Sequence, residues 1–246
     1  MEYAIETEKL TKIYRNSKVK AVDDQTMKVP SGEVFGFLGP NGAGKTTTIY
    51  MLLGILRPTS GEGRILGHPL GSNEAKERIG FLPESATMHL HHSGLSLLHY
   101  YGALLNMRRE DLKTRARKVL ELAGLSKAMD QNIATYSKGM LQRLGIAQAL
   151  LNDPDLLILD EPTANLDPIG RKEVKDLLMH VKEHRKTIFI SSHILSDIEQ
   201  LCDRIAILKE GRLIRSGTIA ELIGDSSSTL EDFFYRTVTG EPDAGS

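Results

Sequence analysis

The chain has 246 residues, 40% of them hydrophobic and 26% charged, which suits one large α/β domain or a domain with a subdomain. Its 31 basic and 32 acidic residues nearly balance without a basic block, so nucleic acid is not an expected partner. A single cysteine, Cys202, and the lack of an apolar run of bilayer length predict a reducing, cytosolic setting, in which any membrane span comes from a partner chain.

The first segments predict two short strands, Tyr3–Leu10 and Gln25–Val29, which we expect to form an antiparallel edge. Tyr14 lies between them, after Leu10-Thr11-Lys12-Ile13. Its ring could stack on an adenine, because a flat π face tolerates any base. A half-buried tyrosine at a strand end explains the same residue, and spacing alone does not separate the two interpretations.

The strongest motif follows the apolar strand Val34–Leu38 and precedes a predicted helix, Thr46–Leu56. It matches G-x-x-x-x-G-K-[ST], the pattern of a phosphate-binding loop, in the strand and helix context that this motif requires. Its residues are Gly39, Pro40, Asn41, Gly42, Ala43, Gly44, Lys45, Thr46 and Thr47. Glycines allow backbone N–H groups to surround an anion at the positive end of the helix. We expect Lys45 to reach the β- and γ-phosphates and the Thr46 hydroxyl to hold Mg²⁺.

The next part of the chain changes from strands to helices. Gly63–Leu66 and Arg78–Leu82 are typical of strands, and the second leads to Pro83 and Glu84. From Ser85 to Leu151 the apolar residues recur every three or four positions, which indicates an inserted helical subdomain. Three histidines, His89, His91 and His92, occur at its start. No carboxylate or thiol pattern supports a metal site there, so we expect a solvated or partner-facing loop.

The apolar run Asp155–Asp160 is typical of a central parallel strand, and two carboxylates, Asp160 and Glu161, stand at its end. Ligands of open α/β sheets bind at the carboxyl ends of the strands, so we expect Asp160 beside the phosphate loop and Mg²⁺. Glu161 follows directly and is placed to orient or deprotonate an attacking water. An exposed acidic pair at a strand end is the alternative.

The last third of the chain predicts further strands and helices. Asp167 and Pro168 are suited to cap and open a helix that runs to about His184, with Asn165 just before it. Thr187–Ser191 predicts a strand that delivers His193 to the same sheet edge, where an imidazole could bind a γ-phosphate, although a lone loop histidine is usually inert. After it we expect a hairpin, Arg204–Leu208 and Arg212–Ser216, then a short helix, Thr218–Ile223, and an amphipathic helix, Leu230–Val238.

A further motif, Tyr136-Ser137-Lys138-Gly139-Met140 followed by Gln142-Arg143, completes the pattern. With the phosphate loop, Asp160-Glu161-Pro162-Thr163 and His193, the chain resembles the ATP-binding cassette family, specifically the nucleotide-binding subunit of a transporter. The resemblance covers about Tyr3 to Gly217. It implies an α/β fold with a P-loop NTPase core, a mixed or parallel sheet, an N-terminal antiparallel β edge and an inserted helical subdomain.

The resemblance also implies domain bounds and residue roles. Residues 1–84 and 155–225 would form the RecA-like core, residues 85–154 the helical subdomain, and residues 226–246 a linker, a short helix and a disordered tail. Tyr14 would stack on adenine, Asp160 with Thr46 and Glu84 would hold Mg²⁺, Glu161 would be the catalytic base, His193 would sense the γ-phosphate, and Lys45 would bind phosphate. The signature residues Ser137, Lys138, Gly139 and Met140 would act on ATP held by a second cassette, near the loop that contains Asn165 and Asp167.

Two departures from the family pattern favour one branch. Glu84 stands where glutamine is usual, and Lys138 and Met140 replace glycine and glutamine in the signature. Both changes resemble bacterial exporters whose membrane permease is a separate chain, as does the tail Leu-Glu-Asp-Phe-Phe that begins at Leu230. We therefore expect an ATPase at the cytoplasmic face of the plasma membrane that works as a homodimer or heterodimer of cassettes.

Other functions remain as alternatives. A soluble cassette ATPase that serves an assembly machine, such as one that builds iron–sulfur clusters, would carry similar motifs. ATPases of translation or DNA repair usually have two cassettes or a long coiled-coil insertion, which this sequence lacks. A purely regulatory nucleotide-binding module is disfavoured by Lys45, Asp160, Glu161 and His193.

Overall fold

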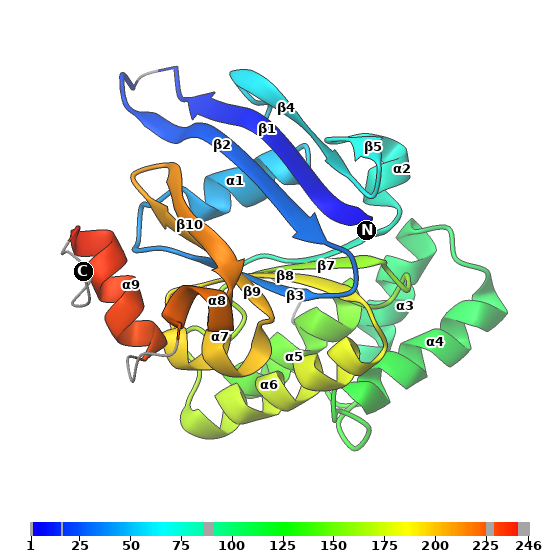
Figure 1. The fold of residues 1–246 in the computed structure, drawn as a ribbon. Coiled ribbons are helices and arrows are strands. Elements are labelled where there is room, and N and C mark those ends of the chain that lie inside the picture. Colours follow the sequence, from blue (N-terminus) through cyan, green and yellow to red (C-terminus); the bar gives the residue numbers. More distant parts are fainter. Residues whose placement is uncertain (1, 16, 86–90, 225–228, 241–246) are drawn as a thin grey trace. The chain divides into compact units, whose positions relative to one another are not determined.

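The computed structural model describes residues 2–15, 17–85, 91–224 and 229–240 (Figure 1). The chain forms two compact units. The first unit contains Met1–Lys76 and Thr187–Ser246, and the second contains Glu77–Lys186. His89, the predicted linker Ser226–Ser228 and the tail beyond Gly240 lie outside the described residues. No helix in the described part of the chain is both long enough and apolar enough to span a bilayer.

An antiparallel sheet occupies the N-terminal part of the first unit, in the order β2-β1-β4-β5 (Figure 1). Its strands are β1 (Tyr3–Ile13), β2 (Lys20–Pro30), β4 (Ser60–Ile65) and β5 (His68–Pro69). The predicted antiparallel edge is confirmed, but β1 continues to Ile13, beyond the predicted Leu10. The extension is paired on both sides, because Ile13 lies opposite Lys20 and Thr11 lies opposite Ser60. This pairing holds β1 extended up to the residue before Tyr14.

Four further strands of the first unit form a mixed arrangement that carries the phosphate loop. They are β3 (Val34–Leu38), β8 (Thr187–Ser192), β9 (Arg204–Lys209) and β10 (Arg212–Thr218). β3 lies between β8 and β9 and is parallel to both, while β10 pairs antiparallel with β9 as the predicted hairpin. Every residue of β3 is buried, as expected for a central parallel strand. Phe35 stacks on Phe189 of β8 with ring centroids 5.8 Å apart.

The helices of the first unit are α1 (Lys45–Leu52), α2 (Asn73–Lys76), α7 (Leu195–Leu201), α8 (Ile219–Ile223) and α9 (Leu230–Thr239). α1 ends four residues before the predicted Leu56. Gly54 has a φ of 70° there, and the N–H of Ile55 donates to the carbonyl of Tyr50. This is the arrangement in which a left-handed glycine ends a helix. The predicted C-terminal helix is confirmed as α9, which packs against α7 and α8.

The second unit combines two parallel strands with four α-helices among its described residues. They are β6 (Ile79–Leu82), β7 (Leu156–Asp160), α3 (Gly94–Leu104), α4 (Arg109–Leu122), α5 (Lys138–Ala149) and α6 (Pro168–Glu183), with a 3₁₀ turn, η1, at Ile133–Thr135. The predicted helical periodicity is confirmed by burial of Leu112, Ala116, Val119 and Ala123. α3 packs against both α4 and α5, and α5 packs against α6.

Candidate functional site

The phosphate loop joins the buried strand β3 to the first turn of α1. Gly44 precedes the helix with a φ of 102°, and a Cβ atom there would lie 2.4 Å from the carbonyl oxygen of Ala21. Only glycine fits this combination of backbone conformation and close approach. No side chain caps α1 within the described residues, so its first turn keeps the dipole end that favours an anion.

Lys45 closes the loop from inside. Its side chain is only 6% exposed, and its Nζ donates a hydrogen bond of 2.7 Å to the carbonyl of Gly39, at the other end of the motif. The ammonium group is therefore held against the first residue of the loop. A buried cation at this point adds to the positive end of α1 and suits the binding of a polyphosphate.

A cleft of about 820 Å³ opens beside the phosphate loop and includes Gly42 in its wall. Its lining residues are Tyr14, Ser17, Val19, Lys20, Ala21, Asp23, Gly42, Lys209, Glu210, Gly211, Arg212 and Ile214. Tyr14 is 42% exposed, and its hydroxyl lies 3.3 Å from Oγ1 of Thr47. The structure thus brings Tyr14 to the phosphate loop, with its ring next to a space whose volume is typical of ligand sites.

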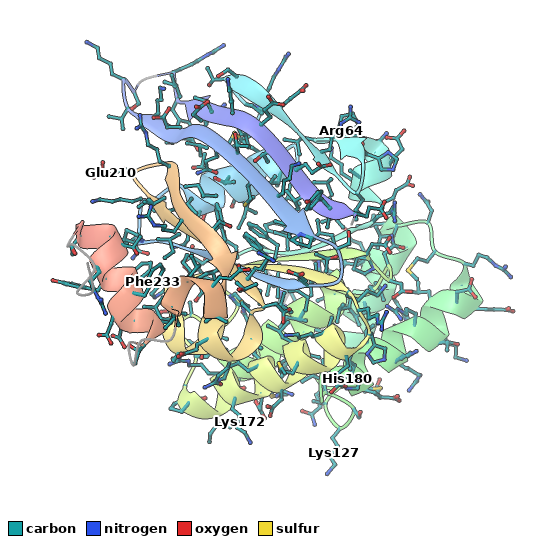
Figure 2. The ribbon with its side chains drawn as sticks, viewed as in Figure 1. Arg64, Lys127, Lys172, His180, Glu210 and Phe233 are labelled. Carbon is teal, nitrogen blue, oxygen red and sulfur yellow. The ribbon has the colours of Figure 1, made fainter. Side chains whose placement is uncertain are left out.

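Asp23, one of the residues that line this cleft, is paired with two basic side chains. Its carboxylate forms ion pairs with Lys20 at 2.5 Å and with Arg212 at 2.6 Å. The hydrogen bond from Lys20, and next the one from Arg212, lower the pKa of the Asp23 carboxyl. The turn between β9 and β10, where Figure 2 labels Glu210, is part of the same wall.

His193 follows β8 at the edge from which the phosphate loop starts. β3 and β8 are parallel, and their last residues, Leu38 and Ser192, lie opposite each other. Gly39 and His193 follow directly after them, so both lie at the same edge of these strands. The histidine is exposed, and the preceding Ser192 hydroxyl accepts a hydrogen bond of 2.9 Å from the N–H of Ile194. The first unit therefore brings together Tyr14, the phosphate loop and the strand end that carries His193.

The second unit collects the predicted acidic residues at one strand edge. Asp160 ends β7 and is 1% exposed, and Glu161 follows it at 6%. β6 is parallel to β7 with Leu82 opposite Leu159, so the exposed Glu84 leaves the same edge. Glu161 has a φ of 52°, a conformation that strains a residue with a side chain. Because Asp160 and Glu161 are both buried, they are not the exposed acidic pair of the alternative interpretation.

The signature residues open α5. Ser137 is the N-cap, and its Oγ accepts a hydrogen bond of 3.2 Å from the N–H of Met140. Lys138 is exposed at the first helical position, and Gly139 is buried where a Cβ would lie 3.2 Å from the Cα of Gly170 in α6. This close approach keeps the start of α5 against the start of α6.

The segment between β7 and α6 is tied to the same helix. Gln142 of α5 donates a hydrogen bond of 2.9 Å from Nε2 to the carbonyl of Pro162, just beyond Glu161. Asn165 has a φ of 59°, and Asp167 caps α6 by accepting a hydrogen bond of 2.6 Å from the N–H of Gly170. The predicted cap is confirmed, so Asp167 has a structural role whatever else it does.

Each of the two units contains oxygen donors of the kind that bind Mg²⁺. In the part of the chain that the structure describes, no three His, Cys, Asp or Glu side chains cluster as a metal site. Mg²⁺ does not need such a cluster, because it is usually bound through one or two carboxylates together with water and substrate phosphates. The hydroxyl of Thr46 and the buried carboxylate of Asp160 are oxygen donors of the kind it prefers. Their joint role stays a prediction.

Sequence reasoning missed the residues that support the phosphate loop from outside. Gln25 is 1% exposed and hydrogen-bonds both to Thr48 of α1 and to Gly211, and the N–H of Gly211 donates to the carbonyl of Ala43. The available signal was a glutamine at the start of the predicted strand Gln25–Val29. A buried amide requires partners, but its partner at Gly211 is 186 positions away.

Comparison with known proteins finds similar sequences and similar structures. The sequence profile described as "ABC transporter" matches residues 22–164, more than half of the chain. An uncharacterized ABC transporter ATP-binding protein of Synechocystis is 45% identical over 228 residues, which are 90% of this chain and 64% of that protein. The chain thus spans less than two thirds of that relative's length.

Two further matches are similarly extensive. The bacitracin transport ATP-binding protein of Bacillus licheniformis is 45% identical over 217 residues, or 87% of this chain and 69% of that protein. The structure of CbiO1 from Clostridium perfringens, described as part of the ABC transporter complex CbiONQ, matches with a TM-score of 0.83 and 29% identity over 92% of each chain. From its profile match, its relatives and its fold, the chain belongs to the ABC transporter family.

Proposed function

We propose that this chain binds and hydrolyses ATP as one of two cassettes that close over two nucleotides and drive a separate membrane permease. The observation that carries the proposal is the phosphate loop, with Gly44 against Ala21 and Lys45 bonded to Gly39. Such a loop pre-arranges backbone N–H groups and one ammonium around a triphosphate. The cleft beside Tyr14 has room for the nucleoside that such a phosphate chain would carry.

The chain's own groups then have distinct tasks. Tyr14 stacks on the adenine, Lys45 holds the β- and γ-phosphates, and His193 contacts the γ-phosphate as a hydrogen-bonding partner. Thr46 and Asp160, with Glu84, hold Mg²⁺, which neutralises the charge that develops on the phosphate oxygens. Glu161 orients and deprotonates the attacking water. Glu161 directly follows the last residue of β7 and has a strained backbone there.

The second cassette completes each site in this proposal. Ser137, Lys138, Gly139 and Met140 begin a helix, and a helix start attracts an anion. They act on the γ-phosphate held by the partner cassette. Asn165 and Asp167 lie in a loop near the same ATP. Closure would move a helical subdomain, residues 85–154, relative to a core of residues 1–84 and 155–225. A permease docked on the cytoplasmic face of the membrane would change state with it.

Export is the direction that we propose for the transporter. Glu84 and Lys138 resemble the exporter branch, and one relative, 45% identical over 217 residues, is named for bacitracin transport. A soluble assembly machine is the second candidate. The two differ in the partner, since only a transporter binds an integral membrane protein.

The test of catalysis is Glu161→Gln, with Glu183→Gln as a matched control because Glu183 has an exposed side chain at the end of α6. We expect Glu161→Gln to bind Mg-ATP like the wild type but to hydrolyse it roughly 10²–10³ times more slowly. The control should keep its activity. Turnover by Glu161→Gln close to that of the wild type would remove Glu161 as the base.

The test of partnership uses the same variant, tagged and isolated from detergent-solubilised cells with Mg-ATP. Co-purification of a stoichiometric integral membrane protein is the expected result. Recovery of soluble proteins alone would refute the proposal of a transporter subunit and favour that of an assembly machine.

A further inference from the structure

Gln25 of β2 carries a buried carboxamide that is bonded at both ends. Its side chain is 1% exposed, Oε1 accepts a hydrogen bond of 3.0 Å from Oγ1 of Thr48, and Nε2 donates one of 2.9 Å to the carbonyl of Gly211. Thr48 lies in the first turn of α1, and Gly211 lies in the turn between β9 and β10. The amide thus joins two segments that flank the phosphate loop.

The chemistry of the partners fixes the orientation of this amide. A carbonyl oxygen can only accept, so Gly211 requires the NH₂ end of Gln25. Oε1 must then face Thr48, whose hydroxyl can donate its single hydrogen to it. The carbonyl of Gly44, also 3.0 Å from the same hydroxyl, competes for that hydrogen. The Thr48 hydroxyl thus lies at equal distance from Gln25 and from the carbonyl at the start of its own helix, and links the two.

The turn at Gly211 is itself hydrogen-bonded to the phosphate loop. The N–H of Gly211 donates a hydrogen bond of 3.0 Å to the carbonyl of Ala43, inside the phosphate loop. The carbonyl of Gly211 also accepts a hydrogen bond of 2.9 Å from the N–H of Asp23. One strand, β2, thus holds the Gly211 turn through two donors, and the turn holds the loop at the residue before Gly44.

We infer that Gln25 is a positioning residue for phosphate binding, which acts through Thr48 and Gly211 to fix the shape of the loop before the nucleotide arrives. What the loop binds rests on the function proposed above. The shape of the loop does not. A loop that must present several N–H groups to one anion loses affinity when those groups are free to move, because binding must then order them.

The variants remove the bonds at either end with little change in volume. Gln25→Met deletes the amide, and Thr48→Val deletes the hydroxyl that it binds, while Thr48→Ser keeps that hydroxyl. Thr7→Val is the matched control. The Thr7 hydroxyl is also buried and donates to the backbone carbonyl of Gln25 at 3.2 Å, but neither this bond nor the one that it accepts from the N–H of Met27 reaches the loop.

Two readouts separate positioning from general stability. In nucleotide-free protein, we expect amide hydrogen exchange of Gly211 and Thr48 to be about tenfold faster in Gln25→Met, as befits one lost hydrogen bond. Equilibrium binding of a fluorescent ATP analogue should weaken by about tenfold in Gln25→Met and in Thr48→Val, and no further in the double variant, because both remove the same link. Thr48→Ser should bind like the wild type. Thr7→Val should lower the urea midpoint without changing affinity.

Other outcomes overturn the inference. Unchanged exchange at Gly211 in Gln25→Met would show that the loop keeps its shape without the amide. Additive losses in the double variant, or an equal loss of affinity in Thr7→Val, would assign the effect to general destabilisation. If the wild type bound no ATP, the proposed function would fail, and the exchange experiment would still decide whether Gln25 positions the loop.

Discussion

Two glycines of the phosphate loop offer a matched test of how its shape is maintained. Gly42 and Gly44 both have left-handed backbones, with φ values of 80° and 102°. Their surroundings differ, because a Cβ on Gly42 would meet nothing within 4 Å, whereas one on Gly44 would lie 2.4 Å from the carbonyl oxygen of Ala21. Alanine at each position therefore imposes backbone strain, but only Gly44→Ala adds a collision.

The expected free energies of unfolding follow from these two terms. A left-handed conformation costs an alanine about 1–2 kcal/mol, which both variants lose. The collision should cost Gly44→Ala about 1–3 kcal/mol more, which is the usual penalty for forcing extra atoms into a packed site. Ala21 cannot withdraw easily, because it belongs to β2, whose neighbouring residues Lys20 and Val22 are paired with β1.

The measurement is urea unfolding of the nucleotide-free protein in EDTA, so that ligand affinity does not enter the comparison. We expect Gly42→Ala to be about 1–2 kcal/mol less stable than the wild type and Gly44→Ala to be about 2–5 kcal/mol less stable. Equal losses in the two variants would refute the reasoning. They would mean that Ala21 moves aside at no cost and that backbone conformation alone explains both glycines.

Two further predictions concern the wall of the adjacent cleft. Lys20 and then Arg212 lower the pKa of Asp23, so the stability that its charge contributes is present above the ordinary aspartate value and lost as pH falls through the folded value. Urea midpoints of Asp23→Asn and the wild type should therefore differ at neutral pH and converge in acid, and a gap that persists in acid would contradict this. Glu210 and Gly211 have φ values of 50° and 80°, as in a type I′ turn, which favours asparagine at the first position. Glu210→Asn should add about 0.5–1 kcal/mol of stability, and a lower midpoint would show that the Glu210 side chain supports the turn.

The parts of the fold that were predictable from the sequence depend on local chemistry. The phosphate loop was predicted from its glycines and Lys45, and the start of α6 from Asp167 and Pro168, because each motif is contained within a few residues. Periodicity located α4 for the same reason. The end of α1 was predicted too late, although Gly54 was present as a stop signal, because the apolar residues continue to Leu56.

Non-local contacts set the limit of prediction. The extension of β1 to Ile13 depends on partners in β2 and β4, and neither register is visible in the sequence of β1. The bond between Gln25 and Gly211 joins residues 186 positions apart. The left-handed backbone of Glu161 was equally hidden, because nothing in an acidic side chain indicates that conformation.

One helix in each unit begins with an unfavourable charge. α1 and α5 each begin with a lysine, Lys45 and Lys138, and neither has an acidic residue in its first turn. A cation at the positive end of a helix is unfavourable by about 0.3–1 kcal/mol. α4 and α9 follow the opposite rule, with two acidic residues in the first turn of each. In the function proposed above, a phosphate at both lysine-bearing starts would reverse the sign of that interaction, so the feature that costs stability in each unit alone would become favourable if two cassettes shared ATP.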